Sequence, residues 1–300
     1  MSHLVIRPLD QGEEELFLSR PDPDLLGLLP THFGYRTLSS EGQYRPEWSW
    51  VALRHGLVVA RAGWWGGPYD TTPRSLDFFD FDDVADGAAL LRAAPFRVGH
   101  DMRLPLGWQA DPVTGPVVEA RVAAAAQAGM RVRARRLRYL WESDQRAPAP
   151  SDRLVFSEEP DDEAVLDAFR RIQADPAAAP NGSGAAVQGL GPVTERELEP
   201  LLGCPPSRSW WRLARTRDGD LVGLAVPARN HVRPVVAFVG VVPAHRGHGY
   251  GYDLLAEATR ILAGHGADEI AAGADAADVP TSRALVRAGY RLVGEQLDLL

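Results

Sequence analysis

The feature that most constrains the fold is a strand, a glycine-rich turn and a helix in direct succession. Residues 235–242 are almost all apolar and predict a buried strand. Residues 243–251 follow, with three alternating glycines. From residue 252 to residue 264, apolar side chains recur at i, i+3 and i+4, which predicts an amphipathic helix. A strand that passes through such a turn into a helix is typical of mixed α/β proteins.

The turn has the composition of an anion-binding loop. Glycine permits positive φ and lets the backbone approach a ligand closely. Unpaired N–H groups at the start of a helix bind phosphate groups. The residues involved are Arg246, Gly247, His248, Gly249, Tyr250, Gly251 and Tyr252. Arg246 adds a cationic donor, and a glycine-rich connection that serves only packing is the alternative.

Two common nucleotide-binding motifs are excluded. The dinucleotide motif Gly-x-Gly-x-x-Gly needs a glycine where this chain has Tyr252. The P-loop needs a lysine, and all 32 basic residues here are arginines. The same absence excludes protein-kinase and Schiff-base chemistry.

Charge and cysteine content narrow the function classes. The net charge of −8 argues against non-specific nucleic-acid binding and mildly favours neutral or cationic partners. The single cysteine, Cys204, excludes an internal disulfide framework. No apolar run is long enough for a membrane span, and the first ten residues lack a signal-peptide core. We therefore expect a cytoplasmic protein.

A proline-containing polar stretch at 144–152 predicts a linker between two halves of the chain. Each half is predicted to contain a strand, a helical region, a hairpin and a further strand, then a helix and a strand. In the first half we predict strands at 4–7, 48–53, 57–64, 75–81 and 131–141, and a helix at 117–129. In the second we predict strands at 154–157, 210–216, 221–228, 235–242, 269–273 and 290–295, and helices at 161–174, 252–264 and 282–288. The shared order indicates an internal duplication.

The turn resembles motif A of the GNAT acyltransferase superfamily, Arg/Gln-x-x-Gly-x-Gly/Ala after a valine-rich strand. Here the motif reads Arg246-x-x-Gly249-x-Gly251 and follows Gly-Val-Val-Pro243. Residues 267–290 resemble motif B of the same superfamily, which ends in Gly-Phe or Gly-Tyr. The resemblance covers about residues 154–300.

The resemblance implies the fold and the domain organisation. We expect an α/β (α+β) protein of two tandem GNAT-like domains, each a mixed, mostly antiparallel sheet flanked by helices. The expected bounds are 1–143 for the first domain, 144–152 for the linker and 153–300 for the acyltransferase domain. In the first domain, the strand at 75–81 leads into an acidic stretch, residues 82–87, with one glycine. We expect that half to be degenerate, because its acidic side chains repel pyrophosphate.

The resemblance also implies acetyl-CoA as the co-substrate. Its pyrophosphate would lie on the turn, and its pantetheine arm would run beside Val241 and Val242, where that strand splays from the next. The motif-B asparagine aligns with Asp278, which would contact the pantetheine or cap the following helix. The implied CoA-binding residues are Val241, Val242, Arg246, Gly247, His248, Gly249, Tyr250, Gly251, Tyr252 and Asp278. No metal is expected, because His245 and His248 have no third ligand nearby.

The catalytic groups are less clearly indicated. Many GNAT enzymes use a tyrosine as general acid, four residues before the glycine of motif B. Counting back from Gly289 gives Leu285, so the usual acid is absent. Asp275, at the end of a strand, and His231, in a loop, are the candidate general bases. A solvated carboxylate and an ordinary loop histidine are the alternatives.

These observations favour an acetyl-CoA-dependent N-acyltransferase that acetylates the amine of a small molecule by direct attack in a ternary complex. The missing tyrosine keeps a catalytically silent acyl-CoA-binding or scaffold protein as an alternative. A protein or peptide N-acetyltransferase is the third possibility. No nucleic-acid or membrane partner is expected. The chain is expected to be a monomer, as a pseudo-dimer of its halves, or a homodimer.

Overall fold

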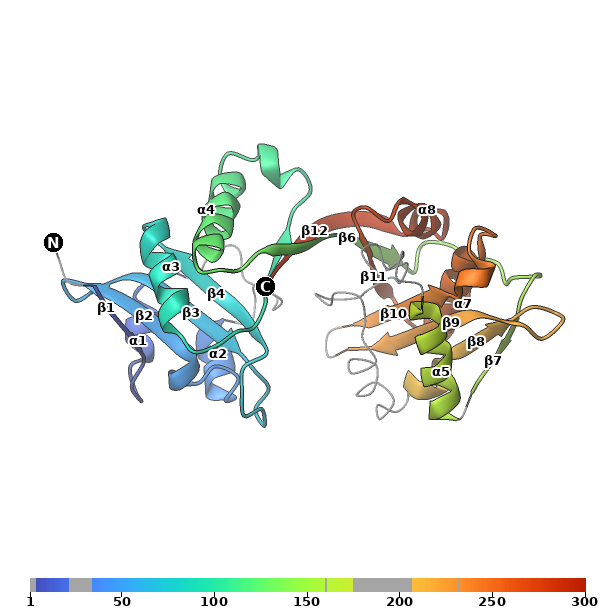
Figure 1. Cartoon of the computed structure of the whole chain (residues 1–300), viewed down its shortest axis with the longest axis horizontal. Coiled ribbons are helices and arrows are strands. Elements are labelled where there is room, and N and C mark those ends of the chain that lie inside the picture. The colour runs from blue at the N-terminus through green and yellow to red at the C-terminus, as the bar shows by residue number, and fades with distance from the viewer. Residues whose placement is uncertain (1–3, 22–33, 160, 175–206, 231–232) are drawn as a thin grey trace. The chain divides into compact units, whose positions relative to one another are not determined.

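The computed structural model describes residues 4–21, 34–159, 161–174, 207–230 and 233–300 (Figure 1). The chain forms two compact units. Unit 1 comprises Met1–Arg135 and Glu295–Leu300, and unit 2 comprises Arg136–Gly294. Each unit is a sheet with helices on both faces, so the expected α/β class is confirmed.

Unit 1 is built on an antiparallel sheet of order β1-β2-β3-β4. A fifth strand continues from β4, where the Leu76 amide donates to the Gly99 carbonyl over 2.8 Å. The strands are β1 (Val5–Pro8), β2 (Ser49–Arg54), β3 (Leu57–Trp65), β4 (Ser75–Phe81) and β5 (His100–Leu104). The helices are α1 (Glu14–Phe17), α2 (Tyr35–Ser40), α3 (Val84–Ala93) and α4 (Thr114–Gln127), with 3₁₀ turns η1 (Pro46–Trp48) and η2 (Trp108–Ala110). Helices α3 and α4 pack in one core, and α1 and α2 pack in another.

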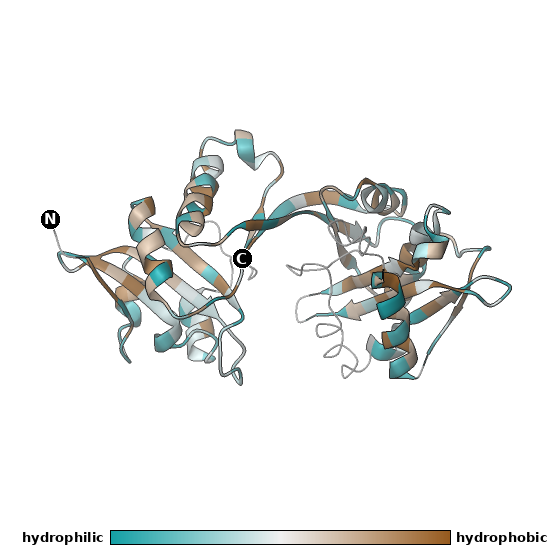
Figure 2. Ribbon diagram, viewed as in Figure 1, coloured by the Kyte–Doolittle hydropathy of each residue, from teal (hydrophilic) through white to brown (hydrophobic). Residues whose placement is uncertain are grey.

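Unit 2 has a mixed sheet of order β6-β11-β10-β9-β8-β7, in which only β10 and β11 are parallel. Its strands are β6 (Val132–Glu142), β7 (Val155–Ser157), β8 (Arg212–Arg215), β9 (Leu221–Arg229), β10 (Pro234–Val241) and β11 (Glu269–Asp275). Its helices are α5 (Asp162–Gln173), α7 (Tyr250–Gly264) and α8 (Val279–Arg287), with 3₁₀ turns η4 (Ser207–Trp210) and η5 (Pro243–His245). Helix α5 covers one face of the sheet, and α7 and α8 cover the other. In Figure 2, α5 shows both brown and teal along its length, as an amphipathic helix on a sheet must.

Two strands connect the units. Residues 136–142 of β6 pair with β11 inside unit 2, and residues 295–299 of β12 (Arg291–Leu299) pair with β5 inside unit 1. Each unit is therefore completed by a strand from the other half of the sequence. The domain bounds 1–143, 144–152 and 153–300 stay a prediction, whereas the compact units divide within β6 and β12.

The internal duplication is visible in the irregularity of two strands. In β4, the register with β3 shifts between Leu76 and Phe78, which places Asp77 in a bulge. In β10, the register with β9 shifts in the same way at Ala237. A bulge of this kind adds one unpaired residue and bends the strand. Both bulged strands lead into the helix that follows them, so the two units share this local geometry as well as their order of elements.

Most predicted elements are present, with shifted ends. Helix α7 begins at Tyr250 instead of residue 252, and β12 runs to Leu299 instead of ending at residue 295. The prediction for the first half was wrong in omitting α3 and β5. Gly87 interrupts the helical pattern of α3, and the fold requires it because a Cβ there would lie 2.4 Å from Cδ1 of Phe81. In β5, both His100 and Asp101 are buried, so the strand shows no polar alternation.

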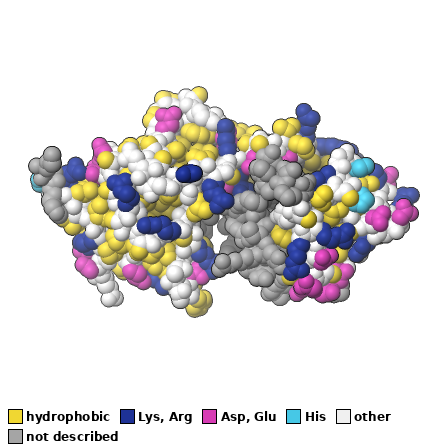
Figure 3. Space-filling view, in the orientation of Figure 1, with side chains coloured by type: hydrophobic (Ala, Val, Ile, Leu, Met, Phe, Trp, Pro, Cys, Tyr) yellow, Lys and Arg dark blue, Asp and Glu magenta, His cyan; other side chains and the backbone are white. Residues whose placement is uncertain are grey.

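Charged side chains of both signs are interspersed on the face shown in Figure 3, where every dark blue residue is an arginine. No helix in the described part of the chain is long and apolar enough to cross a membrane.

Candidate functional site

The site is organised by the divergence of β10 from β11. The two strands pair at one position only, Val235 with Ala271. Strand β10 stays paired with β9 to its end, where the Val242 amide donates to Val222 over 2.8 Å. Backbone groups of an antiparallel pair alternate in direction, so the N–H groups of Val239 and Val241 point away from β9, towards the diverging β11. They are available to pair with an extended ligand.

The side chains of the two predicted valines serve the cores. Val241 packs in the core under α7, and Val242 packs in the core under α5. Both are buried. Any contact that these residues make with a ligand therefore comes from their backbone.

The glycine turn lies between the end of β10 and α7. Gly247 and Gly249 have φ values of 82° and 78°, a region that side-chain-bearing residues rarely adopt. Residues 247–249 are exposed. In the described part of the chain, no N–H from Gly247 to Gly251 donates to a backbone carbonyl. The N-cap, Gly249, has no side chain to satisfy them. The start of α7 therefore presents unpaired donors and its positive dipole end to solvent, which is an anion-binding arrangement.

Arg246 anchors this turn. Its Nε donates to the carbonyl of Val241 over 3.2 Å, and its Nη2 donates to the carbonyl of Ile172 over 2.8 Å. The guanidinium therefore joins the turn to the end of β10 and to the last turn of α5. Direct contact of Arg246 with a phosphate stays a prediction.

Sequence reasoning missed a second arginine at the turn. Nη1 of Arg153 donates to the carbonyl of His248 over 2.9 Å, and its Nη2 forms an ion pair with the buried carboxylate of Asp253. The guanidinium carbon lies 4.9 Å from the centre of the Tyr250 ring. The His248 ring stacks on the same tyrosine at 5.7 Å. Arg153 is far from the turn in sequence, so no local pattern could have indicated it.

A third arginine comes from α8. The guanidinium of Arg287 lies over the Tyr252 ring, 3.8 Å from its centre, and Arg287 is exposed. Arg153 and Arg287 therefore add positive charge beside the first turn of α7, where the aromatic rings of Tyr250 and Tyr252 hold them.

The predicted motif-B residues take different places. The buried carboxylate of Asp278 caps α8, accepting from the Thr281 amide over 3.0 Å and from the Thr281 hydroxyl over 2.7 Å. Leu285, at the position of the family's tyrosine, is fully buried. Asp275 is half-buried at the end of β11, and its carboxylate accepts from the Ala277 amide over 2.8 Å. His231 lies outside the described residues.

Unit 1 has no counterpart of the turn. Strand β4 ends at Phe81 and α3 begins at Val84, so only residues 82–83 connect them. The carboxylate of Asp83 accepts from the Ala85 amide over 2.7 Å and caps the helix. The start of α3 is therefore occupied by the chain's own negative charge.

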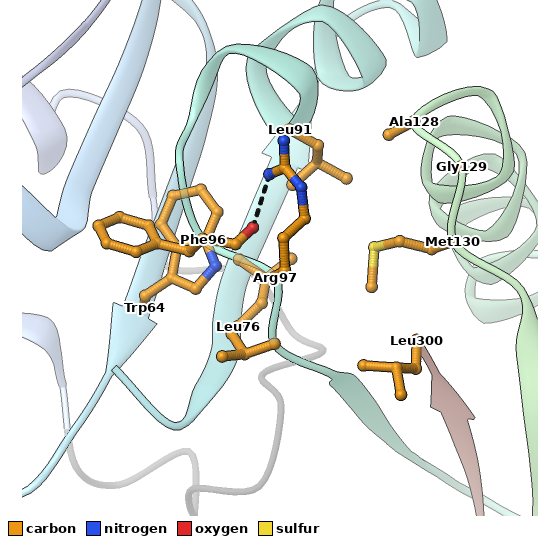
Figure 4. A pocket seen from close by; sticks show the side chains of 10 residues that line it. Trp64, Leu76, Leu91, Phe96, Arg97, Ala128, Gly129, Met130 and Leu300 are labelled. Carbon is orange, nitrogen blue, oxygen red and sulfur yellow. Dashed lines mark hydrogen bonds between the residues drawn. The ribbon is translucent and has the colours of Figure 1, made fainter. Parts of the chain in front are cut away.

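A cavity of about 430 Å³ lies elsewhere in unit 1 (Figure 4). Its lining is mostly apolar, and the guanidinium of Arg97 donates to the carbonyls of Ala94 and Phe96 over 2.8 Å each. The cavity reaches β4 at Leu76, near the beginning of the strand, and not at the end that leads into α3. It is therefore not the counterpart of the glycine turn. Among the residues that the structure describes, no cluster of three or more His, Cys, Asp or Glu side chains could hold a metal ion.

Comparisons with known proteins agree with this geometry. Residues 183–290 match the model of the Acetyltransferase (GNAT) family. A solved GCN5-related N-acetyltransferase from Sphaerobacter thermophilus is 16% identical, with a TM-score of 0.59 over 99% of this chain and 94% of that one. A tandem GNAT protein from the clavulanic acid biosynthesis pathway is also 16% identical, with a TM-score of 0.52 over 99% and 98% of the two chains. No curated protein matches. The predicted resemblance and fold are confirmed.

Proposed function

Since residues 183–290 match the GNAT acetyltransferase family and the whole chain shares the fold of a tandem GNAT protein, we propose that this chain is an acetyl-CoA-dependent N-acetyltransferase. Unit 2 carries the reaction, and a small-molecule amine is the acceptor. The observation that carries the proposal is the set of unpaired N–H groups at the start of α7, beside the strand that diverges from β11.

The residues present fit acetyl-CoA, which supplies the acetyl group as a thioester. The N–H groups of residues 247–251 hold the pyrophosphate. Arg153 and Arg287 add positive charge for the phosphates. The N–H groups of Val239 and Val241 pair with the pantetheine arm and with the thioester carbonyl. Asp278 and Arg246 hold α8 and the turn in place around this site.

The reaction needs a neutral amine held against the thioester. Positioning alone contributes roughly 7–11 kcal/mol in well-oriented systems, so the absence of a tyrosine at Leu285 does not prevent transfer. Asp275, half-buried at the end of β11, is the proposed base that takes the proton from the amine. The attack is direct, in a ternary complex.

The test is acetyl-CoA turnover with a panel of amines, followed as release of free CoA thiol. Cys204 contributes one thiol per chain at most, so multiple turnovers exceed that background. We expect at least one amine class to give acetylated product by mass spectrometry. Asp275→Asn is expected to lower kcat by about 10²-fold or more, as loss of a general base does, with little change in the KM for acetyl-CoA.

A catalytically silent acyl-CoA-binding protein is the second candidate. The observation that favours it is Leu285, which leaves no titratable side chain at the position of the family's general acid. Stoichiometric binding of acetyl-CoA without turnover of any amine would support this candidate over the enzyme.

A further inference from the structure

The sheet of unit 2 carries an arginine that no other described side chain neutralises. Arg138 lies in the middle of β6, opposite Gly273 of β11. It is half-buried, and it has no hydrogen-bond or ion-pair partner among the described residues. Burial, and to a smaller extent the charge of Arg233, lower the pKa of its guanidinium. An unpaired, half-buried cation costs folding free energy, and a bound anion would offset this cost.

Arg138 lies on the face of the sheet that α7 and α8 do not cover. Its neighbours in β6 on the other face include Tyr139 and Trp141, which pack in the core under these helices. Side chains alternate between faces along a strand. In β11, Ala274 packs in the same core, so Asp275 shares the face of Arg138.

Asp275 is the nearby opposite charge, but the two do not form an ion pair. Asp275 stands opposite Arg136 in the register, and Arg138 stands opposite Gly273, so the two side chains are diagonal neighbours on adjacent strands. The carboxylate of Asp275 accepts from the Ala277 amide and takes part in no ion pair in the described part of the chain. This sheet face therefore carries the carboxylate of Asp275, the buried Arg136 opposite it and, set diagonally from the carboxylate, Arg138.

These charges lie where an acceptor would have to bind. Strand β11 lies between β6 and β10, and β10 and β11 diverge beyond their single pair, Val235 and Ala271. Asp275 is at the end of β11 on this diverging side. The N–H groups of Val239 and Val241 point towards the same side from β10.

We propose that the acceptor is an amino carboxylate, such as an α-amino acid, whose carboxylate pairs with Arg138 while its ammonium lies at Asp275. The inference rests on the proposed acetyltransferase function of unit 2. A guanidinium binds a carboxylate through two parallel N–H donors, so it fixes the orientation of the acceptor as well as its charge. The overall charge of −8 favours cationic acceptors, but it averages over the whole surface, whereas Arg138 acts locally.

The transfer step balances with these groups. The ammonium gives one proton to Asp275, and the neutral nitrogen then forms a C–N bond with the thioester carbon. The C–S bond breaks, and the second proton released by the nitrogen passes to the CoA thiolate. The products are an N-acetyl amino carboxylate and free CoA, and the carboxylate stays paired with Arg138 throughout. Arg138 is therefore a specificity-determining residue.

The experiment compares free amino acids with their matched C-terminal amides as acceptors, with acetyl-CoA as donor. The amides keep the amine and the side chain but lose the negative charge. We expect the wild type to favour the free acids by at least 10-fold in kcat/KM. In Arg138→Gln, we expect the KM for the free acid to rise about 10- to 100-fold, the range for a lost charge-assisted hydrogen bond. The KM for the amide and for acetyl-CoA should stay within about twofold, since neither relies on Arg138.

Three further variants sharpen the result. Arg138→Lys should recover part of the preference, because it keeps the charge without the two-pronged geometry. Arg133→Gln, an exposed arginine of the same strand, is the matched control and should change nothing. Arg138→Leu should raise the melting temperature, because it removes an unpaired cation from a half-buried position. A large fall in melting temperature would show a structural role and overturn the inference.

The remaining outcomes separate the two proposals. Equal or better use of the amides by the wild type overturns the amino-carboxylate inference and leaves acetyl transfer intact. Binding of acetyl-CoA, measured by calorimetry, with no acetylation of either acceptor set also overturns the inference. If calorimetry detects no binding of acetyl-CoA at all, the proposed function itself is overturned. The calorimetric measurement therefore distinguishes failure of the proposed function from failure of the amino-carboxylate inference.

Discussion

Burial decides the protonation state of one histidine in unit 1. His100 is fully buried, and its Nδ1–H donates to the carbonyl of Leu76 over 2.7 Å. Its Nε2 has no hydrogen-bond partner. Burial, with a further contribution from the charge of Arg121, lowers the pKa of His100 to about 3. The imidazole of His100 is therefore neutral in the folded protein at neutral pH.

This pKa predicts how stability depends on pH. An unfolded histidine titrates near ~6.5, so below that pH the unfolded state binds a proton that folded His100 does not. The stabilisation is present above about pH 6.5 and is lost as the pH falls towards 3. We expect the free energy of unfolding to fall by about 2 kcal/mol between pH 8 and pH 5. Urea denaturation at both pH values measures it.

His100→Gln removes the titrating group and should remove most of this pH dependence. His55→Asn, at an exposed turn position with φ of 53°, is the control and should leave the dependence unchanged. If the free energy of unfolding falls equally between pH 8 and pH 5 in wild type and in His100→Gln, a neutral, buried His100 is contradicted.

Asp278 gives a second prediction, because its carboxylate caps α8. Removing such a cap typically costs about 1 kcal/mol. We expect Asp278→Ala to lower the free energy of unfolding by this amount and Asp278→Ser, which keeps a capping oxygen, to lower it by less. Both variants should bind acetyl-CoA within about threefold of wild type. If Asp278→Ser stays stable but loses acetyl-CoA affinity more than 10-fold, Asp278 contacts the pantetheine instead.

Local residue patterns predicted the glycine turn but not the arginines around it. Gly247 and Gly249 are recognisable because their spacing follows an apolar strand and precedes an amphipathic helix. Arg153 reaches the turn from residues before β7, and Arg138 reaches the acceptor face from β6. Their roles depend on tertiary contacts between distant segments. In a chain with 32 basic residues, sequence alone does not distinguish them from solvated arginines.

At the scale of elements, the turn is held by arginines from outside it. Arg153 bridges the carbonyl of His248 and the carboxylate of Asp253, so it fixes the turn and carries charge beside it. We expect Arg153→Gln, which keeps hydrogen-bond donors but loses the charge, to raise the Kd for acetyl-CoA about 5- to 10-fold. Isothermal titration calorimetry measures this change.

Arg217→Gln is the matched control for Arg153. Arg217 is exposed, and its guanidinium donates to the carbonyl of Asp152, near the same segment. Its substitution should leave the Kd unchanged. If Arg153→Gln also leaves the Kd unchanged, the charge of Arg153 acts only on the turn's structure and not on the phosphates.

Elements with a clear hydrophobic period were the predictable ones. The strand at 75–81 matches β4 residue for residue, and the helix at 252–264 differs from α7 only at its start. The first turn of α7 contains Tyr250 and Gly251. Because glycine is typical of turns, the sequence predicted that the helix begins only after Gly251. Tertiary packing overrides the local signal in α3, where Phe81 fills the space beside Gly87.

At the scale of the whole molecule, the sequence did not predict that β6 joins the sheet of unit 2 and β12 that of unit 1. Local pattern shows that residues 131–141 and 290–295 form strands, but not which sheet each one joins. In the structure, Tyr139 and Trp141 of β6 are buried in the core of unit 2, and Leu297 and Leu299 of β12 are buried in the core of unit 1. The linker at 144–152 therefore follows a strand that unit 2 needs.

Two fragments test whether unit 2 needs β6. Residues 136–294 contain every strand of unit 2, and we expect this fragment to unfold cooperatively. Residues 153–294 lack the β6 strand, so β11 loses its antiparallel partner and the core loses Tyr139 and Trp141. Each such loss is worth about 3–5 kcal/mol, so we expect this shorter fragment not to fold. Equal melting temperatures for the two fragments would instead support the domain boundary at residue 153.

The central claim is that the turn at 247–251 binds the pyrophosphate of acetyl-CoA. The most direct test is thermal unfolding with and without acetyl-CoA, for wild type, Gly249→Glu and Gly219→Glu. Gly219 has φ of 94° and lies in the β8–β9 turn, so it controls for the backbone strain of a side chain at positive φ. A Cβ at Gly219 would meet nothing within 4 Å, and a Cβ at Gly249 would lie 3.7 Å from Nη2 of Arg153. At 100-fold excess over Kd, binding adds about 2.7 kcal/mol.

We predict that acetyl-CoA raises the melting temperature of wild type and Gly219→Glu by several degrees and leaves Gly249→Glu unchanged. In Gly249→Glu, the new carboxylate lies among the N–H donors and repels the pyrophosphate. A shift that survives in Gly249→Glu, or no shift in wild type at millimolar acetyl-CoA, would contradict the account.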